Sequence, residues 1–207
     1  LAAANNHHRT VERLLQLHAD PNRTNSYGWT ALMHASLHGH YDVVQLLLGA
    51  TDCDDIDAQT LFGASALTMA CRQGHLVVAK LLIDYEAQID VSTVLTAVQY
   101  GHEALTELLL EQYFDIDAQL SYTGLSALMV AAVNGKIKIA EMLENKGANL
   151  ELADIRKYTA MDLAAQAGQL ETETFLRSRL LRSKYLKTHG AVGMTSLECG
   201  ERLIEVN

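Results

Sequence analysis

One phrase recurs along the chain, first as Thr30-Ala-Leu-Met-His-Ala-Ser-Leu-His-Gly-His40 and then as Ser65-Ala-Leu-Thr-Met-Ala-Cys-Arg-Gln-Gly-His75. It returns as Ser126-Ala-Leu-Met-Val-Ala-Ala-Val-Asn-Gly-Lys136 and Thr159-Ala-Met-Asp-Leu-Ala-Ala-Gln-Ala-Gly-Gln169, and in a shorter form as Thr93-Val-Leu-Thr-Ala-Val-Gln-Tyr-Gly-His102. Similarity at a fixed period is typical of proteins built from stacked repeats. The repeat unit therefore decides the fold.

The glycines of the five copies measure the period. Steps from Gly39 to Gly74, Gly101, Gly135 and Gly168 are 35, 27, 34 and 33 residues long. A second apolar stretch follows four of the copies, at residues 43–48, 77–82, 105–110 and 137–143. The opening residues, from Ala2 to Leu15, match the second part of one further copy.

Each copy predicts a pair of short helices. The opening Thr or Ser is a preferred N-cap, whose hydroxyl accepts a hydrogen bond from a free backbone N–H. The glycine ends the first helix, in the left-handed conformation that glycine adopts at low cost. Neither helix can bury its apolar side alone, so neighbouring copies must stack to form a continuous core.

These residues resemble the ankyrin repeat family. The resemblance is carried by Gly28-Trp-Thr-Ala-Leu32, Ala35, Gly39-His40 and Leu46-Leu47, and the pattern recurs from Gly63, Gly124 and Lys157. It covers roughly residues 1–176. It implies an all-α ankyrin-repeat solenoid of about six helix-turn-helix repeats with hairpin loops, the first of them incomplete.

Two features depart from the family pattern. The proline of the ankyrin Thr-Pro-Leu-His tetrapeptide is Ala or Val in every copy, and its histidine is replaced by Met33, Thr68, Leu95, Met129 or Asp162. Loss of the proline removes preorganisation of the first turn. Loss of the histidine removes a hydrogen bond between repeats, so we expect a less stable stack.

The 27-residue step leaves no room for a hairpin at the irregular join near 89–93. Either the hairpin is deleted, or the natural protein has a longer flexible segment here that this sequence lacks. We favour the second interpretation. An array interrupted in this way is faintly similar to ankyrin proteins that also carry a sterile alpha motif domain and act at cilia. The chain starts at Leu1, so we expect it to be part of a longer protein.

After Leu176 the repeat pattern stops. Residues 177–207 are expected to form a C-terminal capping helix and an extension. The helix is basic, and Leu180, Leu181, Tyr185 and Leu186 form its apolar side. A capping element of this kind covers the end of a repeat stack.

Composition limits the function. The net charge of −9 disfavours nucleic-acid binding. Three cysteines without a CxxC pair favour a reducing compartment, either the cytoplasm or, alternatively, the nucleus or a cilium. No apolar run is long enough for membrane insertion. No nucleophile with a matching base and no phosphate-binding loop occurs, so we expect no enzyme activity and no cofactor.

Two clusters could bind a metal ion. His34 and His38 are four residues apart on one predicted helix, and Asp52, Asp54, Asp55 and Asp57 form an acidic loop. We favour exposed helix positions for the two histidines and a solvated turn for the loop. Cys71 is expected to be a buried, inert thiol.

The resemblance implies a concave groove that binds a protein or peptide. Its hairpin tips carry Tyr27, Trp29, Phe62, Tyr122, Leu125, Arg156 and Tyr158, and its first helices carry Leu37, His38, Arg72, Gln73, Gln99, Tyr100 and Asn134. Aromatic residues and arginine are enriched at binding hot spots. The sequence therefore predicts a protein-interaction scaffold. The alternatives are a regulatory or autoinhibitory segment of a larger enzyme or signalling protein, and a structural spacer. The partner and the oligomeric state stay open.

Overall fold

The computed structural model describes residues 1–50, 55–112 and 115–189. The described residues form eleven α-helices. These are α1 (His8–Gln16), α2 (Ala31–Leu37), α3 (Tyr41–Leu48), α4 (Ala66–Gln73), α5 (Leu76–Asp84), α6 (Val91–Tyr100), α7 (Glu103–Glu111), α8 (Ala127–Val133), α9 (Ile137–Asn145), α10 (Ala160–Gln166) and α11 (Leu170–His189).

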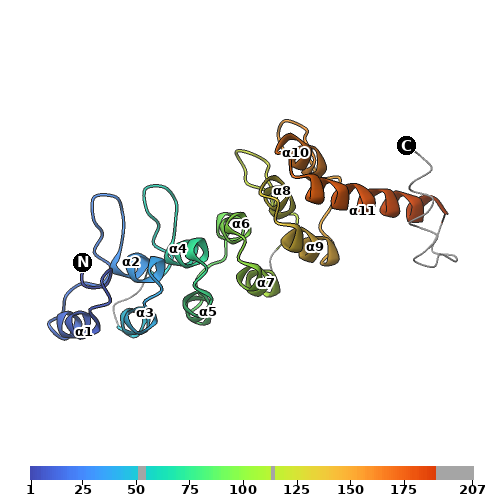
Figure 1. The fold of residues 1–207 in the computed structure, drawn as a ribbon. Coiled ribbons are helices and arrows are strands. Elements are labelled where there is room, and N and C mark those ends of the chain that lie inside the picture. The colour runs from blue at the N-terminus through green and yellow to red at the C-terminus, as the bar shows by residue number, and fades with distance from the viewer. Residues whose placement is uncertain (51–54, 113–114, 190–207) are drawn as a thin grey trace.

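The helices lie in two rows (Figure 1). The first helices of the repeats, α2, α4, α6, α8 and α10, pack in succession along one row. The second helices, α1, α3, α5, α7, α9 and α11, form the other row. The only β pairing among the described residues is an isolated bridge between Ala153 and Thr159. The predicted all-α solenoid of paired helices is confirmed.

Residues at equivalent positions in the repeats fill the core. An alanine four positions before the glycine is fully buried in five repeats, which lets the first helices approach closely. In the same five repeats, the second helix contributes a buried leucine eight positions after that glycine. The alanines are Ala35, Ala70, Ala97, Ala131 and Ala164, and the leucines are Leu47, Leu82, Leu109, Leu143 and Leu176. Because each repeat packs mainly on its immediate neighbours, the core runs continuously along the stack and is built from contacts between adjacent repeats.

The predicted starts and ends of the first helices are confirmed in four repeats. Thr30, for example, accepts a hydrogen bond from the backbone N–H of Met33 at 3.2 Å. Gly74 has φ +77°, in the left-handed region, and a Cβ added there would lie 2.5 Å from the ring of His102. The glycine is therefore required by both its backbone conformation and its close contact with the next repeat.

The fifth copy differs at its start. The sequence pattern placed the cap of this helix at Thr93, but α6 begins at Val91 and is capped by Asp90. The Asp90 carboxylate accepts from the backbone N–H of Thr93 at 2.7 Å. Aspartate is as good an N-cap as serine, and its position three residues earlier adds length to the helix. The chain therefore passes from α5 to α6 in a short turn without a hairpin. The hypothesis of a longer segment at this join stays a prediction.

The residues that replace the family histidine make other hydrogen bonds. Asp162 accepts from the backbone N–H of Thr159 at 2.9 Å and closes a capping box at the start of α10. The hydroxyl of Thr68 lies 2.9 Å from the hydroxyl of Thr93, and both side chains are buried. A hydrogen bond between repeats is thus present at the α4–α6 interface, contrary to the expectation that it is lost there.

The C-terminal boundary expected at residue 176 falls inside a helix. α11 runs without a break from Leu170 to His189, so the second helix of the last repeat and the expected capping helix are one element. Ion pairs from Arg179 to Glu144 and from Lys184 to Glu151 connect the middle and the C-terminal part of this helix to the preceding repeat. The expected extension, residues 190–207, lies outside the described residues.

Candidate functional site

Four loops, which we call fingers, each lead into a first helix. They comprise residues 23–30, 58–65, 118–126 and 152–159. All four rise from the row of first helices (Figure 1). We call the surface formed by these fingers and by the exposed sides of the five first helices the finger face. It corresponds to the groove that the sequence predicted.

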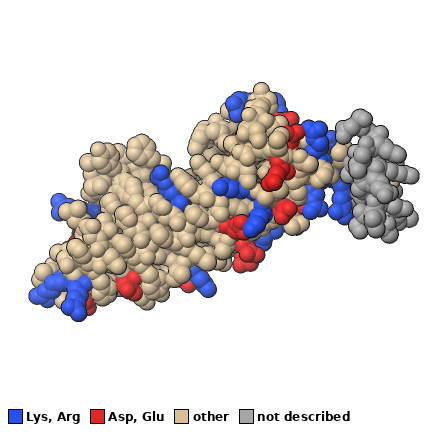
Figure 2. All heavy atoms as spheres, viewed as in Figure 1, with Lys and Arg blue, Asp and Glu red and all other residues tan. Residues whose placement is uncertain are grey.

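The fingers form two pairs. The backbone N–H of Leu61 donates to the carbonyl of Tyr27 at 3.1 Å, which joins the first two fingers. The N–H of Ile155 donates to the carbonyl of Thr123 at 3.2 Å and joins the last two. Between the pairs stands α6, which has no finger. The resulting finger gap is visible as a notch in the outline of the molecule (Figure 2).

Local hydrogen bonds hold the finger tips in shape. In the first finger the Asn25 side chain accepts from the backbone N–H groups of Tyr27 and Trp29, at 2.9 and 3.0 Å. In the last finger Asp154 accepts from those of Arg156 and Tyr158, at 2.8 and 2.9 Å. Burial by itself would raise the pKa of Asp154, but the Tyr158 and Arg156 N–H groups and the Arg156 guanidinium outweigh it, so the pKa is lowered. The carboxylate stays ionised and fixes the turn.

The predicted tip residues differ in exposure. The side chains of Phe62, Tyr122 and Tyr27 are 86%, 73% and 60% exposed. Arg156 and Tyr158 are also exposed. The two remaining tip residues, Trp29 and Leu125, are half-buried and pack on the core. The ring of Trp29 lies 4.8 Å from that of His34, so this tryptophan anchors the finger locally and offers less surface to a partner.

The predicted first-helix residues come to one surface. His38, Arg72, Gln73, Gln99, Tyr100 and Asn134 are exposed, whereas Leu37 is half-buried. The guanidinium of Arg72 lies over the Tyr100 ring of the next repeat, 5.8 Å from its centre. A similar pair joins Arg156 and Tyr158 at 5.4 Å. Cation–π contact of this kind orients an arginine while its nitrogens stay open to a ligand.

Comparisons with known proteins agree with this geometry. A family model of ankyrin repeats matches the chain in three overlapping segments, residues 1–93, 50–120 and 94–180. The chain belongs to the ankyrin repeat family.

Relatives and solved structures extend the likeness. A probable E3 ubiquitin-protein ligase of Oryza sativa subsp. japonica, XBOS33, is 35% identical over 162 residues, which are 72% of this chain and 31% of that protein. Ankyrin repeat and SAM domain-containing protein 6 of Danio rerio is 30% identical over 143 residues, 55% of this chain and 19% of that protein. The faint similarity to ankyrin proteins with a sterile alpha motif domain is thereby supported. This ankyrin chain spans a third or less of the length of these two relatives.

A solved structure shows the same fold. It is a chain in the complex of a predatory endopeptidase from Bdellovibrio bacteriovorus with an immunity protein. The TM-score is 0.78 with 26% sequence identity, and the match covers 85% of this chain and 94% of that one.

Sequence reasoning missed three features of this ankyrin surface. Leu61 and Ile155 are exposed at finger tips, next to Phe62 and Arg156, and enlarge the apolar area. Leu61 and Ile155 follow a finger's polar turn residue, a signal that the aligned repeats contain. The stacking of Arg72 on Tyr100 joins residues 28 positions apart. Only the packing of successive repeats could reveal that contact.

The histidines of the Gly-His turns link the ankyrin repeats. Nε2 of His40, His75 and His102 lies 3.1 to 3.2 Å from a backbone carbonyl of the preceding repeat. His34, expected to be exposed, is half-buried beside Trp29. Burial, the N-terminal amino group and then His38 lower the pKa of His34. Within residues 1–50, 55–112 and 115–189, no three His, Cys, Asp or Glu side chains come together as a metal site. Asp52 and Asp54 lie outside these residues.

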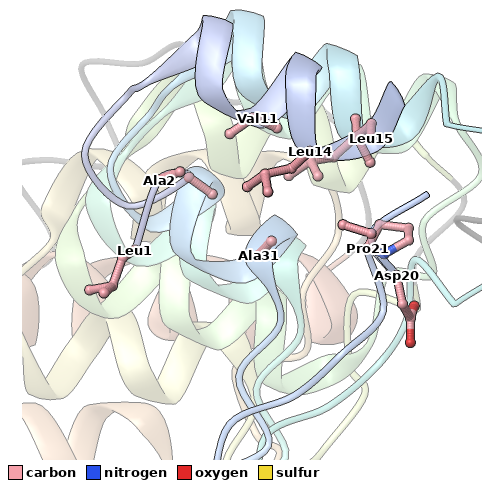
Figure 3. Close-up of a pocket in the computed structure, with 11 residues that line it drawn as sticks. Leu1, Ala2, Val11, Leu14, Leu15, Asp20, Pro21 and Ala31 are labelled. Carbon is pink, nitrogen blue, oxygen red and sulfur yellow. The ribbon is translucent and has the colours of Figure 1, made fainter. Parts of the chain in front are cut away.

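Cys71 and an apolar hollow complete the list of candidate sites. Cys71 is fully buried, as expected, and burial followed by the charge of Asp90 raises the pKa of its thiol. The hollow lies between α1 and the start of α2 and has a volume of about 140 Å³ (Figure 3). Alkyl groups such as those of Val11 and Leu14 line it. It is separate from the finger face.

No described helix is long and apolar enough to cross a membrane.

Proposed function

We propose that this ankyrin chain is a protein-interaction scaffold whose finger face binds a partner protein or peptide. The observation that carries the proposal is the row of exposed aromatic side chains at the finger tips, Tyr27, Phe62 and Tyr122. Exposed apolar side chains that gather on one side of a protein mark an interaction site more often than scattered single residues do. Large, rigid rings on a fixed backbone lose little conformational entropy when a partner covers them.

The rigidity of the fingers supports the same function. Each finger pair is joined through the backbone, and side chains such as Asn25 and Asp154 satisfy the N–H groups of the tips. A surface that is already ordered binds more tightly than one that must be ordered on binding. The first helices add exposed polar groups, among them Gln73, Gln99 and Asn134.

Site-specific photo-crosslinking in cells tests the proposal. A photoreactive phenylalanine analogue is placed at Phe62 or Tyr122, and at Tyr85 as a control. Tyr85 is an exposed aromatic residue at the end of α5, in the row of second helices. We expect discrete crosslinked partners from the two finger positions and not from Tyr85. The same adducts from all three positions, or from Tyr85 alone, would exclude the finger face as the binding surface.

A second function is favoured by the relatives. Several of them are E3 ubiquitin-protein ligases, and this chain matches about a third of their length. We therefore propose, as the alternative, that these repeats regulate a larger enzyme or signalling protein of which they are part. Activity of the full-length protein, measured with and without substitution of Phe62 and Tyr122 by alanine, tests this. Equal activity of the two forms on a substrate that does not touch the repeats would exclude regulation through this surface.

A further inference from the structure

We infer that the finger face selects an acidic peptide segment that also carries bulky apolar residues. The inference rests on the proposed function and names the class of partner. It starts from the distribution of charge in the structure. The exposed charged residues of the finger face are Arg23, Arg72, Arg156 and Lys157, all of them positive.

The two carboxylates within this surface are already engaged. Asp154 is buried and bound to the N–H groups of its own finger. Asp162 is half-buried and bound to Thr159 in the capping box. Hydrogen bonds hold both carboxylates in place, and the four exposed cations outnumber them. All exposed Asp and Glu of the described residues lie on the second helices or in the turns that precede fingers and first helices.

The positive charge of the finger face contrasts with the charge of the whole chain, which is −9. In Figure 2 the two N-terminal fingers, with α2 and α4 below them, carry no red. Red occurs lower down on this half, and on the C-terminal half it also occurs higher up, close to the last repeat. Asp90 borders the finger gap but caps α6, where its carboxylate accepts from the N–H of Thr93. An acidic partner is therefore repelled by most of the molecule and attracted at the finger face. Complementary charge of this kind selects and orients partners.

The cations are arranged to receive carboxylates. Arg72 has no ion pair among the described residues, and the Tyr100 ring holds its guanidinium in place. Arg156 contacts Asp154 through Nε at 3.3 Å, and the ring of Tyr158 supports it from one side. The terminal nitrogens of both guanidinium groups can donate two parallel hydrogen bonds to a carboxylate.

The distance between these arginines sets the length of the partner. Arg72 stands on α4, and Arg156 precedes α10, three first helices further along the stack. Packed helices are about 8–10 Å apart, so three steps correspond to about 24–30 Å. An extended peptide rises about 3.3 Å per residue, so at least about eight residues are needed to cover this distance along the stack. In the order of the stack, the exposed Tyr100 at the end of α6 and the exposed Tyr122 in the finger before α8 come between the two arginines. Their rings favour bulky apolar side chains in the middle of the segment.

Selection from a random library tests the charge preference directly. Phage that display random 12-residue peptides are selected on the immobilised wild-type chain, with competition by the Tyr122→Ala variant to remove phage that bind elsewhere. We expect the enriched peptides to have a net negative charge and at least one bulky apolar residue. Enriched peptides that are neutral or basic overturn the inference and leave the proposed function standing. If no peptide requires Tyr122, the proposed function fails as well.

Affinity measurements then test the arginines. Fluorescence anisotropy is recorded with one selected acidic peptide and with the same peptide in which Glu and Asp are replaced by Gln and Asn. Exposed ion pairs predict about 2- to 5-fold weaker binding for each of R72Q and R156Q at low salt. The loss should shrink at high salt. R72K keeps the charge but loses the planar guanidinium that lies over Tyr100 and can donate two parallel hydrogen bonds, so its affinity should fall between those of the wild type and R72Q.

Lys80→Gln is the matched control. Lys80 is exposed on α5, in the row of second helices, and the substitution changes the net charge by the same amount. Its affinity for the acidic peptide should equal that of the wild type. The inference is overturned if K80Q weakens binding as much as R72Q does, or if the Gln and Asn peptide binds as tightly as the acidic one. Urea unfolding of each variant verifies that the fold is intact.

Discussion

Removal of one hydroxyl at the α4–α6 interface should destabilise the stack in a way that depends on which hydroxyl is removed. Thr68 and Thr93 are buried and their hydroxyl oxygens are 2.9 Å apart. Thr68 has a second hydroxyl partner, Ser65, at 3.1 Å. Among the described residues, the hydroxyl of Thr93 has the hydroxyl of Thr68 as its one hydrogen-bond partner. Valine has nearly the shape of threonine, so substitution by valine removes the hydrogen bond and leaves the volume unchanged.

The magnitudes follow from this arrangement. In T93V, Thr68 keeps its bond to Ser65, and the loss is one net hydrogen bond, about 1 kcal/mol. In T68V, the Thr93 hydroxyl is left buried without a partner, which costs about 2–3 kcal/mol. The double variant has no stranded hydroxyl, so it should cost less than T68V alone. The order expected for the loss of stability is therefore T68V first, then T93V and the double variant.

Urea unfolding followed by far-UV circular dichroism measures these differences, with the slope of the transition as the check that the same structure unfolds. The double-mutant cycle should give a coupling energy of about 1 kcal/mol or more between the two sites. Equal losses for T68V and T93V, or a double variant equal to their sum, would refute the hydroxyl bridge. Since this bridge lies at the join that has no finger, the result also measures how firmly the two halves of the stack are connected.

Three further predictions concern Gly74, Cys71 and Asp154. Gly74→Ala should lower the free energy of unfolding in urea by about 2–3 kcal/mol, because φ at Gly74 is positive and the new Cβ displaces the His102 ring. Gly168→Ala is the control: φ is +72° there and no atom lies within 4 Å of the added Cβ, so the loss should be only about 1 kcal/mol. Equal losses for the two variants would contradict this reasoning. In a background with Cys53 and Cys199 changed to serine, a maleimide should label the buried Cys71 only when the stack opens, and labelling should be faster when T68V is added. Immediate labelling of the folded protein without T68V would show that the thiol is accessible. The pKa of the Asp154 carboxyl is lower in the folded protein than in the unfolded chain, where it is about 4. The ionised carboxylate therefore stabilises the fold fully above a pH of about 4, and this stabilisation is lost as the pH falls through the pKa of the folded state. The stability advantage of the wild type over D154N should therefore be constant from pH 7 to 5 and shrink below pH 4, and an advantage that grows on acidification would contradict the assigned ionisation.

Part of the site was predictable from the sequence and part was not. The positions of Tyr27, Phe62 and Tyr122 follow from their place in the repeat, because each lies at the turn that precedes a helix cap. The half-buried state of Trp29 did not follow, since a residue beside the turn can point outward or onto the core. The ring of His34 decides this, and His34 is brought there by the helix that Trp29 precedes.

The sequence by itself determined the repeat, its caps and its period. These depend on local physics: a hydroxyl or carboxylate at the N-cap, glycine at a positive φ, and an apolar residue where each helix meets its neighbour. Tertiary structure alone decided how the irregular join is closed, that the last repeat and the C-terminal helix are one element, and that Arg72 lies over Tyr100. Those features depend on distances between repeats, which the sequence pattern does not contain. The positive finger face of a negatively charged chain arises in the same way, because stacking places charges from separate repeats on common surfaces.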